Sequence, residues 1–205
     1  EVLNPKAWWR GDLDWVDRER LSLAFLGYPS APLGINTEYV KPAELKSYRD
    51  LLNPKWKGKI AMNDPSMAGT GAKWVGVIGM QITGLDFMRE LVKQEPFIIR
   101  DQRLQVEWLA RGKYPIAIQP KTDVMGEARR AGASIIDLTP DEGTYMSSGS
   151  GNLSLINRAP HPNAARLYLN WLLGREAQAL HSKAVLLPSS RIDVEVSTDY
   201  IDPFN

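Results

Sequence analysis

The chain has 205 residues, with 25 Lys and Arg, 24 Asp and Glu, two His and no Cys, so its formal net charge is +1. This balance, without a long run of either sign, argues against a nucleic-acid-binding protein. The absence of Cys excludes thiol nucleophiles, disulfides and Cys-ligated metal centres. A hydrophobic content of 43% excludes a disordered chain, and the length allows one large domain or two small ones.

The first part of the chain predicts short strands separated by breakers. Leu21–Leu26 reads as a buried strand and Leu33–Asn36 as a second one, after Pro29 and Pro32. The remaining predicted elements of this part are a short helix at 47–52 that Pro54 ends, and a strand at 59–63.

The middle of the chain alternates helices and strands. Residues 71–82 are apolar nearly all round, which predicts a buried helix, and Phe87, Met88, Leu91 and Val92 form one face of an amphipathic helix. Further elements follow as a strand at 97–99, a helix capped by Asp101 and closed by Gly112, a strand at 114–119, a helix at 123–131 and a strand at 134–138. This alternation is typical of an α/β domain with a largely parallel sheet.

The C-terminal part predicts two helices, one from Pro162 to Gly174 and one ending near Lys183. The first carries a wide apolar stripe, on which Trp171 is also expected to be buried. Such a stripe needs a sheet beneath it, and no strand is predicted after Asn157. The sheet must therefore come from elements elsewhere.

Enzymatic motifs are poorly represented. No G-x-S-x-G elbow, Walker A loop, G-x-G-x-x-G or H-E-x-x-H sequence occurs. His161 stands at a helix start, where a surface or capping role is expected, and His181 stands in the last turn of a helix, where a cation favours the dipole. An α/β hydrolase that uses Ser150 or Asp64 with His161 stays open as an alternative.

The most specific local feature is the segment 63–71, Asn-Asp-Pro-Ser-Met-Ala-Gly-Thr-Gly, a strand end followed by a loop of small residues that opens a helix. Backbone N–H groups at a helix start attract anions, and hydroxyls of Ser66 and Thr70 can add donors. An ordinary capped turn explains the segment equally well. Two more polar loops, Arg100-Asp101 and Gln119–Asp123, follow strands and either converge with the first loop or are solvated. The candidate ligand-binding residues are Ser66, Gly69, Thr70, Gly71, Arg100, Asp101, Gln119, Thr122, Asp123 and Tyr145.

Two longer segments resemble a known family. The sequence Asp-Leu-Leu-Asn-Pro-Lys-Trp-Lys-Gly-Lys-Ile at 50–60 is similar to the D-L-L-x-P-K-W-K-G-K-I segment of bacterial extracellular solute-binding proteins of family 1. The Asn-Arg-Ala-Pro-His-Pro-Asn-Ala-Ala run at 157–165, with Asn170-Trp171-Leu172 and Gln178, is similar to a second region of that family. The resemblance extends over about residues 21–190. This family includes ferric-ion, thiamine and aminoethylphosphonate binders, which are substrate-binding components of ABC importers.

The resemblance implies the α/β, two-lobed, hinge-bending fold of type II periplasmic binding proteins. Residues 35–145 would form the complete second lobe, while 1–34 and 146–205 would supply hinge strands and the C-terminal share of the first lobe. The chain begins Glu1-Val2-Leu3 without a signal region, which we interpret as a processed or truncated product. Family members carry an additional N-terminal lobe segment ahead of the part seen here, so the resemblance implies a fragment that lacks that segment.

The resemblance also implies a function without catalysis. The protein would capture a small anionic or zwitterionic solute between the lobes and deliver it to the membrane permease of an ABC importer. It would be periplasmic or extracellular, free or lipid-anchored, monomeric when complete, and independent of cofactors, metals and nucleic acid. Ferric-ion binders carry two adjacent tyrosines, but the matching positions lie near Thr122 and Asp123, and no Tyr pair occurs. A periplasmic ligand-sensing domain stays open as a further alternative.

Overall fold

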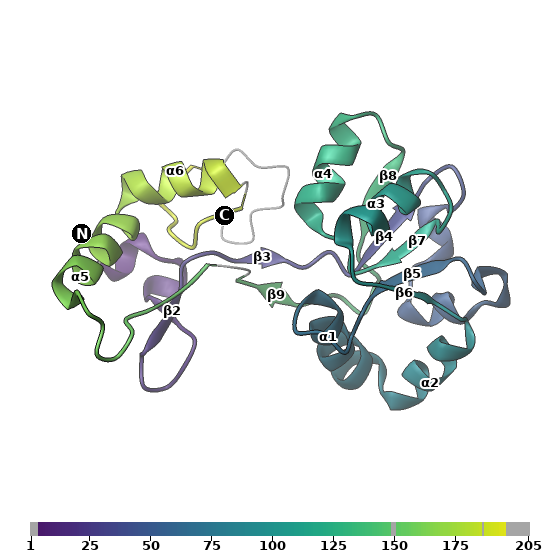
Figure 1. The fold of residues 1–205 in the computed structure, drawn as a ribbon, viewed down its shortest axis with the longest axis horizontal. Coiled ribbons are helices and arrows are strands. Elements are labelled where there is room, and N and C mark those ends of the chain that lie inside the picture. The colour runs from purple at the N-terminus through teal and green to yellow at the C-terminus, as the bar shows by residue number, and fades with distance from the viewer. Residues whose placement is uncertain (1–3, 149–150, 186, 196–205) are drawn as a thin grey trace. The chain divides into compact units, whose positions relative to one another are not determined.

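The computed structural model describes residues 4–148, 151–185 and 187–195, and the chain divides into two compact units (Figure 1). Unit 2 consists of Ser30–Tyr145, and unit 1 of Glu1–Pro29 and Met146–Asn205. The chain therefore enters unit 2 after Pro29 and leaves it before Met146. Unit 2 begins before residue 35, where the sequence placed the boundary, because the strand around that residue pairs inside unit 2.

The sheet of unit 2 has the strand order β6-β5-β7-β4-β8. Its strands are β4 (Leu33–Asn36), β5 (Ile60–Asn63), β6 (Phe97–Ile99), β7 (Ile116–Ile118) and β8 (Ile135–Leu138). Strand β5 pairs parallel with both β6 and β7, whereas β4 runs antiparallel to β7 and β8. Every strand except β4 thus runs in one direction, which confirms the predicted α/β domain with a largely parallel sheet.

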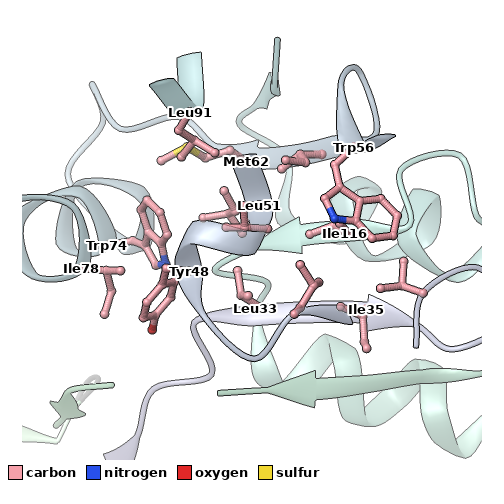
Figure 2. Close-up of a cluster of buried hydrophobic side chains, with 14 of the residues drawn as sticks. Leu33, Ile35, Tyr48, Leu51, Trp56, Met62, Trp74, Ile78, Leu91 and Ile116 are labelled. Atoms are coloured by element: carbon pink, nitrogen blue, oxygen red, sulfur yellow. The ribbon is translucent and has the colours of Figure 1, made fainter. Parts of the chain in front are cut away.

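Helices cover both faces of this sheet, as the alternation along β7 requires. Ile116 and Ile118 belong to the core on one face, where Trp74 and Leu51 pack over the strands (Figure 2). Ala117, between them, belongs to the core on the other face. The helices of unit 2 are α1 (Thr70–Trp74), the π-helix η6 (Val75–Thr83), α2 (Leu85–Lys93), α3 (Gln102–Ala110) and α4 (Thr122–Arg130), with 3₁₀ turns η3 (Pro42–Glu44), η4 (Tyr48–Leu52) and η5 (Pro54–Trp56).

The helical run over residues 70–83 differs from its prediction. It is helical, but it changes from α to π geometry at Val75, and only one side is covered. Trp74 and Ile78 are fully buried, whereas Met80 is 60% exposed. The prediction of burial on all sides is wrong because this helix has the core on its inner side only.

Unit 1 is built around two small sheets. One has the order β1-β2-β10, and in the other β3 pairs antiparallel with β9. Its elements are β1 (Asp14–Trp15), β2 (Ser22–Ala24), β3 (Tyr28–Pro29), β9 (Met146–Ser147), β10 (Asn152–Ser154), α5 (Pro162–Leu172), α6 (Arg175–Val185) and the 3₁₀ turns η1 (Pro5–Ala7) and η2 (Trp9–Gly11). Its core is small and centres on Trp8, Phe25 and Leu172.

Two expectations about unit 1 are corrected. Leu172 is the buried residue of α5, while Trp171 is 57% exposed, so the predicted burial of that Trp is wrong. An apolar stripe shows which face a helix is able to bury, and little of this face of α5 is buried in the described structure. The ring of His181 lies edge-on to Phe25, and burial lowers its pKa, so the neutral imidazole is favoured over the expected cation.

Among the described residues, no helix is both long and apolar enough to cross a membrane.

Candidate functional site

Three loops of unit 2 begin at one edge of its sheet. In the parallel register Asn63 lies opposite Ile99, and Met62 lies opposite Ile118, so β5, β6 and β7 end side by side. Ligands of open α/β sheets bind at this carboxyl edge. The predicted loops after these strands therefore leave the sheet at neighbouring positions.

A cavity of about 190 Å³ lies at the end of β5. A water molecule occupies roughly 30 Å³ of liquid, and pockets for whole drug-sized ligands start at about 300 Å³. The cavity therefore accommodates one small chemical group. Its lining consists of Asn63, Asp64, Met67, Ala68, Gly69, Thr70, Gly71, Ile99, Arg100 and Gln102.

Unpaired backbone donors are the main chemical feature of this cavity. Within the described parts of the chain, the N–H groups of residues 68–72 have no acceptor, and the first bond back into the loop runs from Lys73 N to Gly69 O at 3.1 Å. No acid stands in the first turn of α1, and no side chain caps it. Successive free N–H groups at the start of a helical run make a favourable environment for an anion.

The backbone geometry requires glycine at both positions 69 and 71. Gly69 has φ +148° and ψ −151°, a conformation that is essentially restricted to glycine. A Cβ on Gly71 would lie 2.5 Å from the carbonyl oxygen of Asn63. The start of α1 therefore approaches the end of β5 so closely that only hydrogen fits at position 71.

An ionised carboxylate that is paired with Arg100 forms part of the cavity wall. Asp64 Oδ1 accepts hydrogen bonds from Ser66 N at 2.9 Å and Ser66 Oγ at 2.6 Å, and Oδ2 accepts one from Arg100 Nε at 2.8 Å. These bonds, with the Ser66 hydroxyl first and Arg100 next, lower the pKa of Asp64 to about 2. Asp64 is thus ionised at neutral pH and accepts hydrogen bonds on both oxygens, while the terminal nitrogens of Arg100 make no hydrogen bond within the described chain.

The hydroxyl of Thr70 is held by a residue that the sequence did not single out. Gln102, the first residue of α3, donates from Nε2 to Thr70 Oγ1 at 3.1 Å. Since that oxygen acts as acceptor here, its own hydrogen is directed elsewhere. No local pattern connects these residues, which are 32 positions apart in the chain.

A buried amide network lies behind the cavity. Asn63 Nδ2 donates to Gln105 Oε1 at 2.9 Å and to the carbonyl of Gln119 at 2.7 Å. The side chain of Gln119 continues the network, because its Nε2 donates to Ser30 Oγ at 2.6 Å and its Oε1 accepts from the Tyr145 hydroxyl at 3.3 Å. Gln105 is another residue that sequence analysis missed, although it is fully buried.

The remaining predicted residues have other surroundings. Asp101 caps α3 by accepting from the N–H groups of Arg103 and Leu104. Thr122 is the first residue of α4, and Asp123 pairs with Lys121 at 3.0 Å. Of the ten candidates, the cavity wall includes Gly69, Thr70, Gly71 and Arg100, with Ser66 bonded to it through Asp64.

Asp64 has a structural environment of its own within unit 2. Its hydrogen bonds come from Ser66 and Arg100. Ser150, the other nucleophile considered, lies outside the described residues. No group of three or more His, Asp or Glu side chains in the described chain could hold a metal ion.

Comparisons with known proteins agree on one family. Its sequence profile, described as "Bacterial extracellular solute-binding protein", matches residues 25–184. An uncharacterized protein of Haemophilus influenzae is 29% identical over 155 residues, which are 72% of this chain and 44% of that protein. This chain thus spans less than half of that curated relative.

Solved structures show the same fold at low identity. The periplasmic binding protein AfuA of Actinobacillus pleuropneumoniae, solved with exogenous fructose-6-phosphate bound, is 22% identical with a TM-score of 0.71, over 95% of this chain and 63% of that one. A ferric binding protein of Campylobacter jejuni is 15% identical with a TM-score of 0.76, over 100% of this chain and 67% of that one. The α/β periplasmic-binding-protein fold predicted from the sequence is therefore confirmed.

Proposed function

The chain belongs to the family of bacterial extracellular solute-binding proteins, and we propose that it forms most of the solute receptor of an ABC importer. In this role it binds a small solute reversibly and delivers it to the membrane permease. Unit 2 would be the complete second lobe, and unit 1 would be the hinge strands with the C-terminal share of the first lobe. The complete protein would act as a monomer in the periplasm or outside the cell, free or lipid-anchored.

The observation that carries the ligand assignment is the row of unpaired N–H groups at residues 68–72 around a cavity of about 190 Å³. Thr70 and the terminal nitrogens of Arg100 add further donors. The negative charge of Asp64 is balanced by the guanidinium of Arg100. The chain has a net charge of only +1, so attraction to an anion must be local. We infer that the cavity holds one oxyanion group of the solute.

A tetrahedral oxyanion suits this donor set better than a carboxylate. A carboxylate offers two oxygens, whereas a phosphate ester or phosphonate offers three, which can accept from more of these N–H groups at once. AfuA, which shares the fold, was solved with a sugar phosphate. We therefore propose a phosphorylated or phosphonate solute, anionic or zwitterionic, whose charged end enters the cavity while the rest stays outside it.

Iron is the second ligand to consider, because a ferric binding protein shares the fold. No two tyrosines are adjacent in this sequence, and Thr122 and Asp123 stand where the family's iron ligands are expected. These residues favour an organic oxyanion over a phenolate-bound ferric ion.

Titration with a ligand panel tests the proposal. The ¹H–¹⁵N NMR signals of residues 68–72 should shift on addition of 2-aminoethylphosphonate, glycerol phosphate or sulfate, and should not shift with glucose or spermidine. Ferric citrate provides the iron arm of the panel. A chain that is folded but whose amides respond to no oxyanion would refute the ligand assignment.

A further inference from the structure

The hydrogen bond between Gln102 and Thr70 determines in which direction the Thr70 hydroxyl can donate. What we infer from this bond rests on the proposed oxyanion function. Thr70 stands at the start of the helical run 70–83, and Gln102 stands at the start of α3, after the neighbouring strand β6. Both residues line the cavity. The two loops are thus connected through a side-chain bond beside the place where the ligand's oxygen would lie.

A threonine hydroxyl has one hydrogen and two lone pairs. Here Gln102 Nε2 occupies a lone pair of Thr70 Oγ1 at 3.1 Å. An amide N–H group can only donate, so it cannot receive the hydroxyl hydrogen. The hydrogen of Thr70 is consequently available to the cavity, alongside the unpaired N–H groups of residues 68–72.

We propose that Gln102 is a positioning residue that fixes Thr70 as a hydrogen-bond donor and thereby makes the cavity select a fully deprotonated oxygen of the bound anion. A protonated P–OH group at this point would place its hydrogen against that of Thr70. Gln102 acts through Thr70 and does not need to touch the ligand.

A double-mutant cycle separates this role from general stabilisation. Sulfate is the probe, because it carries no proton near neutral pH and its affinity reports on the cavity alone. Gln102→Leu should weaken sulfate binding by roughly three- to tenfold in the native chain. In the Thr70→Val background the same substitution should change affinity by less than about twofold, because no hydroxyl is left to position.

A pH profile supplies a readout that a purely structural role would not change. The charged side chains close to Gln102 are Asp64 and Arg100 in the cavity wall, with Asp101 and Arg103 on either side of it in the chain. These residue classes ordinarily titrate outside the range between about pH 5 and pH 8. Sulfate affinity of the native chain should therefore be nearly constant across that range.

Gln102→Glu should behave differently. At about pH 7.5 the new carboxylate accepts the Thr70 hydrogen and repels the anion, so affinity should fall more than about tenfold. As the pH falls toward about 4.5 the new carboxyl gains a proton, becomes a donor again, and affinity should recover. The recovery should be smaller when Gln102→Glu is combined with Thr70→Val.

The outcomes are distinguishable. Additive losses for Gln102→Leu and Thr70→Val, or native sulfate affinity of Gln102→Glu at about pH 7.5, would overturn the positioning role while leaving the oxyanion site intact. If the native chain shows no response of residues 68–72 to sulfate or 2-aminoethylphosphonate, the proposed function itself fails. The ¹H–¹⁵N spectrum of each variant verifies that it is folded.

Discussion

Two loops at the same edge of the sheet in unit 2 use similar residues for different purposes. The β5 loop (residues 64–69) leaves its backbone donors unpaired, and no acid stands in the first turn of the helix that follows. The β7 loop (residues 119–121) is bonded through Gln119 to Asn63 and Ser30, and the next helix carries Asp123 in its first turn. The N–H groups of residues 121–124 have no acceptor in the described chain either, so the acid at the start of α4, and not the number of free donors, distinguishes the two loops.

The largest expected effect is that of placing an acid in the first turn of α1, where α4 already has Asp123. Thr70→Asp should weaken oxyanion binding by about a hundredfold or more, because a carboxylate would lie beside the ligand's charge. Calorimetric titration with 2-aminoethylphosphonate measures the loss. Unchanged affinity would remove this loop from the site.

Asp123→Asn is the matched control for that substitution. Asp123 pairs with Lys121 on an exposed surface, and such pairs contribute about 0–1 kcal/mol. Affinity for 2-aminoethylphosphonate should stay within about twofold of the native value. A large change would mean that the β7 loop contributes directly to the same site.

Gly71→Ala tests the close approach that shapes the β5 loop. The added Cβ would lie 2.5 Å from the Asn63 carbonyl oxygen, so the loop must move, and the free energy of unfolding should fall by about 2–3 kcal/mol. Urea denaturation measures this change. Gly76→Ala is the control, since nothing lies within 4 Å of its Cβ position and helix propensity should add up to about 1 kcal/mol. Equal stabilities of the two variants would contradict this interpretation.

Gln119→Leu should separate stability from binding. The substitution removes the hydrogen bonds that the Gln119 side chain makes with the hydroxyls of Ser30 and Tyr145, so the unfolding free energy should fall by about 1–2 kcal/mol. Oxyanion affinity should change less than about threefold, because the Gln119 side chain points into the amide network. Native stability combined with a large loss of affinity would instead identify Gln119 as a ligand contact.

The smallest effect concerns the titration of Asp64. Ser66→Ala should raise the pKa of Asp64 from about 2 toward its ordinary value, and Arg100→Gln should raise it less, because the Ser66 hydroxyl is the larger cause. A carboxyl whose pKa is lowered in the folded state adds stability above about pH 4, and that stability is lost as the pH falls toward 2. Carboxyl ¹³C NMR measures both pKa values, and the reverse order would contradict the hydrogen-bond assignment.

The sequence predicted the strand, loop and helix of the proposed site at the carboxyl end of β5, because their signals are local. Apolar runs marked β5 and β7, and the segment around Gly69 and Gly71 marked the turn between strand and helix. Asp101 was recognised as a helix cap from its position alone, and the structure confirms the bonds.

The sequence did not predict which hydrogen-bond partners the side chains would have. Thr70 meets Gln102 across 32 positions, and Asn63 meets Gln119 across 56. Such contacts depend on which strands become neighbours, and no local pattern encodes that. The same reason explains Trp171, whose helical period predicted a buried face that is exposed in the described structure.

The sequence by itself indicated the family and the α/β fold of unit 2, and it singled out the loop at 63–71 as a candidate site, since motifs, hydrophobic periods and turn residues are properties of neighbouring positions. Only the tertiary structure decided which donors are free. Sheet order brings β5, β6 and β7 together, and the hydrogen bonds formed there engage the Gln119 side chain, whereas the N–H groups of residues 68–72 have no acceptor in the described chain.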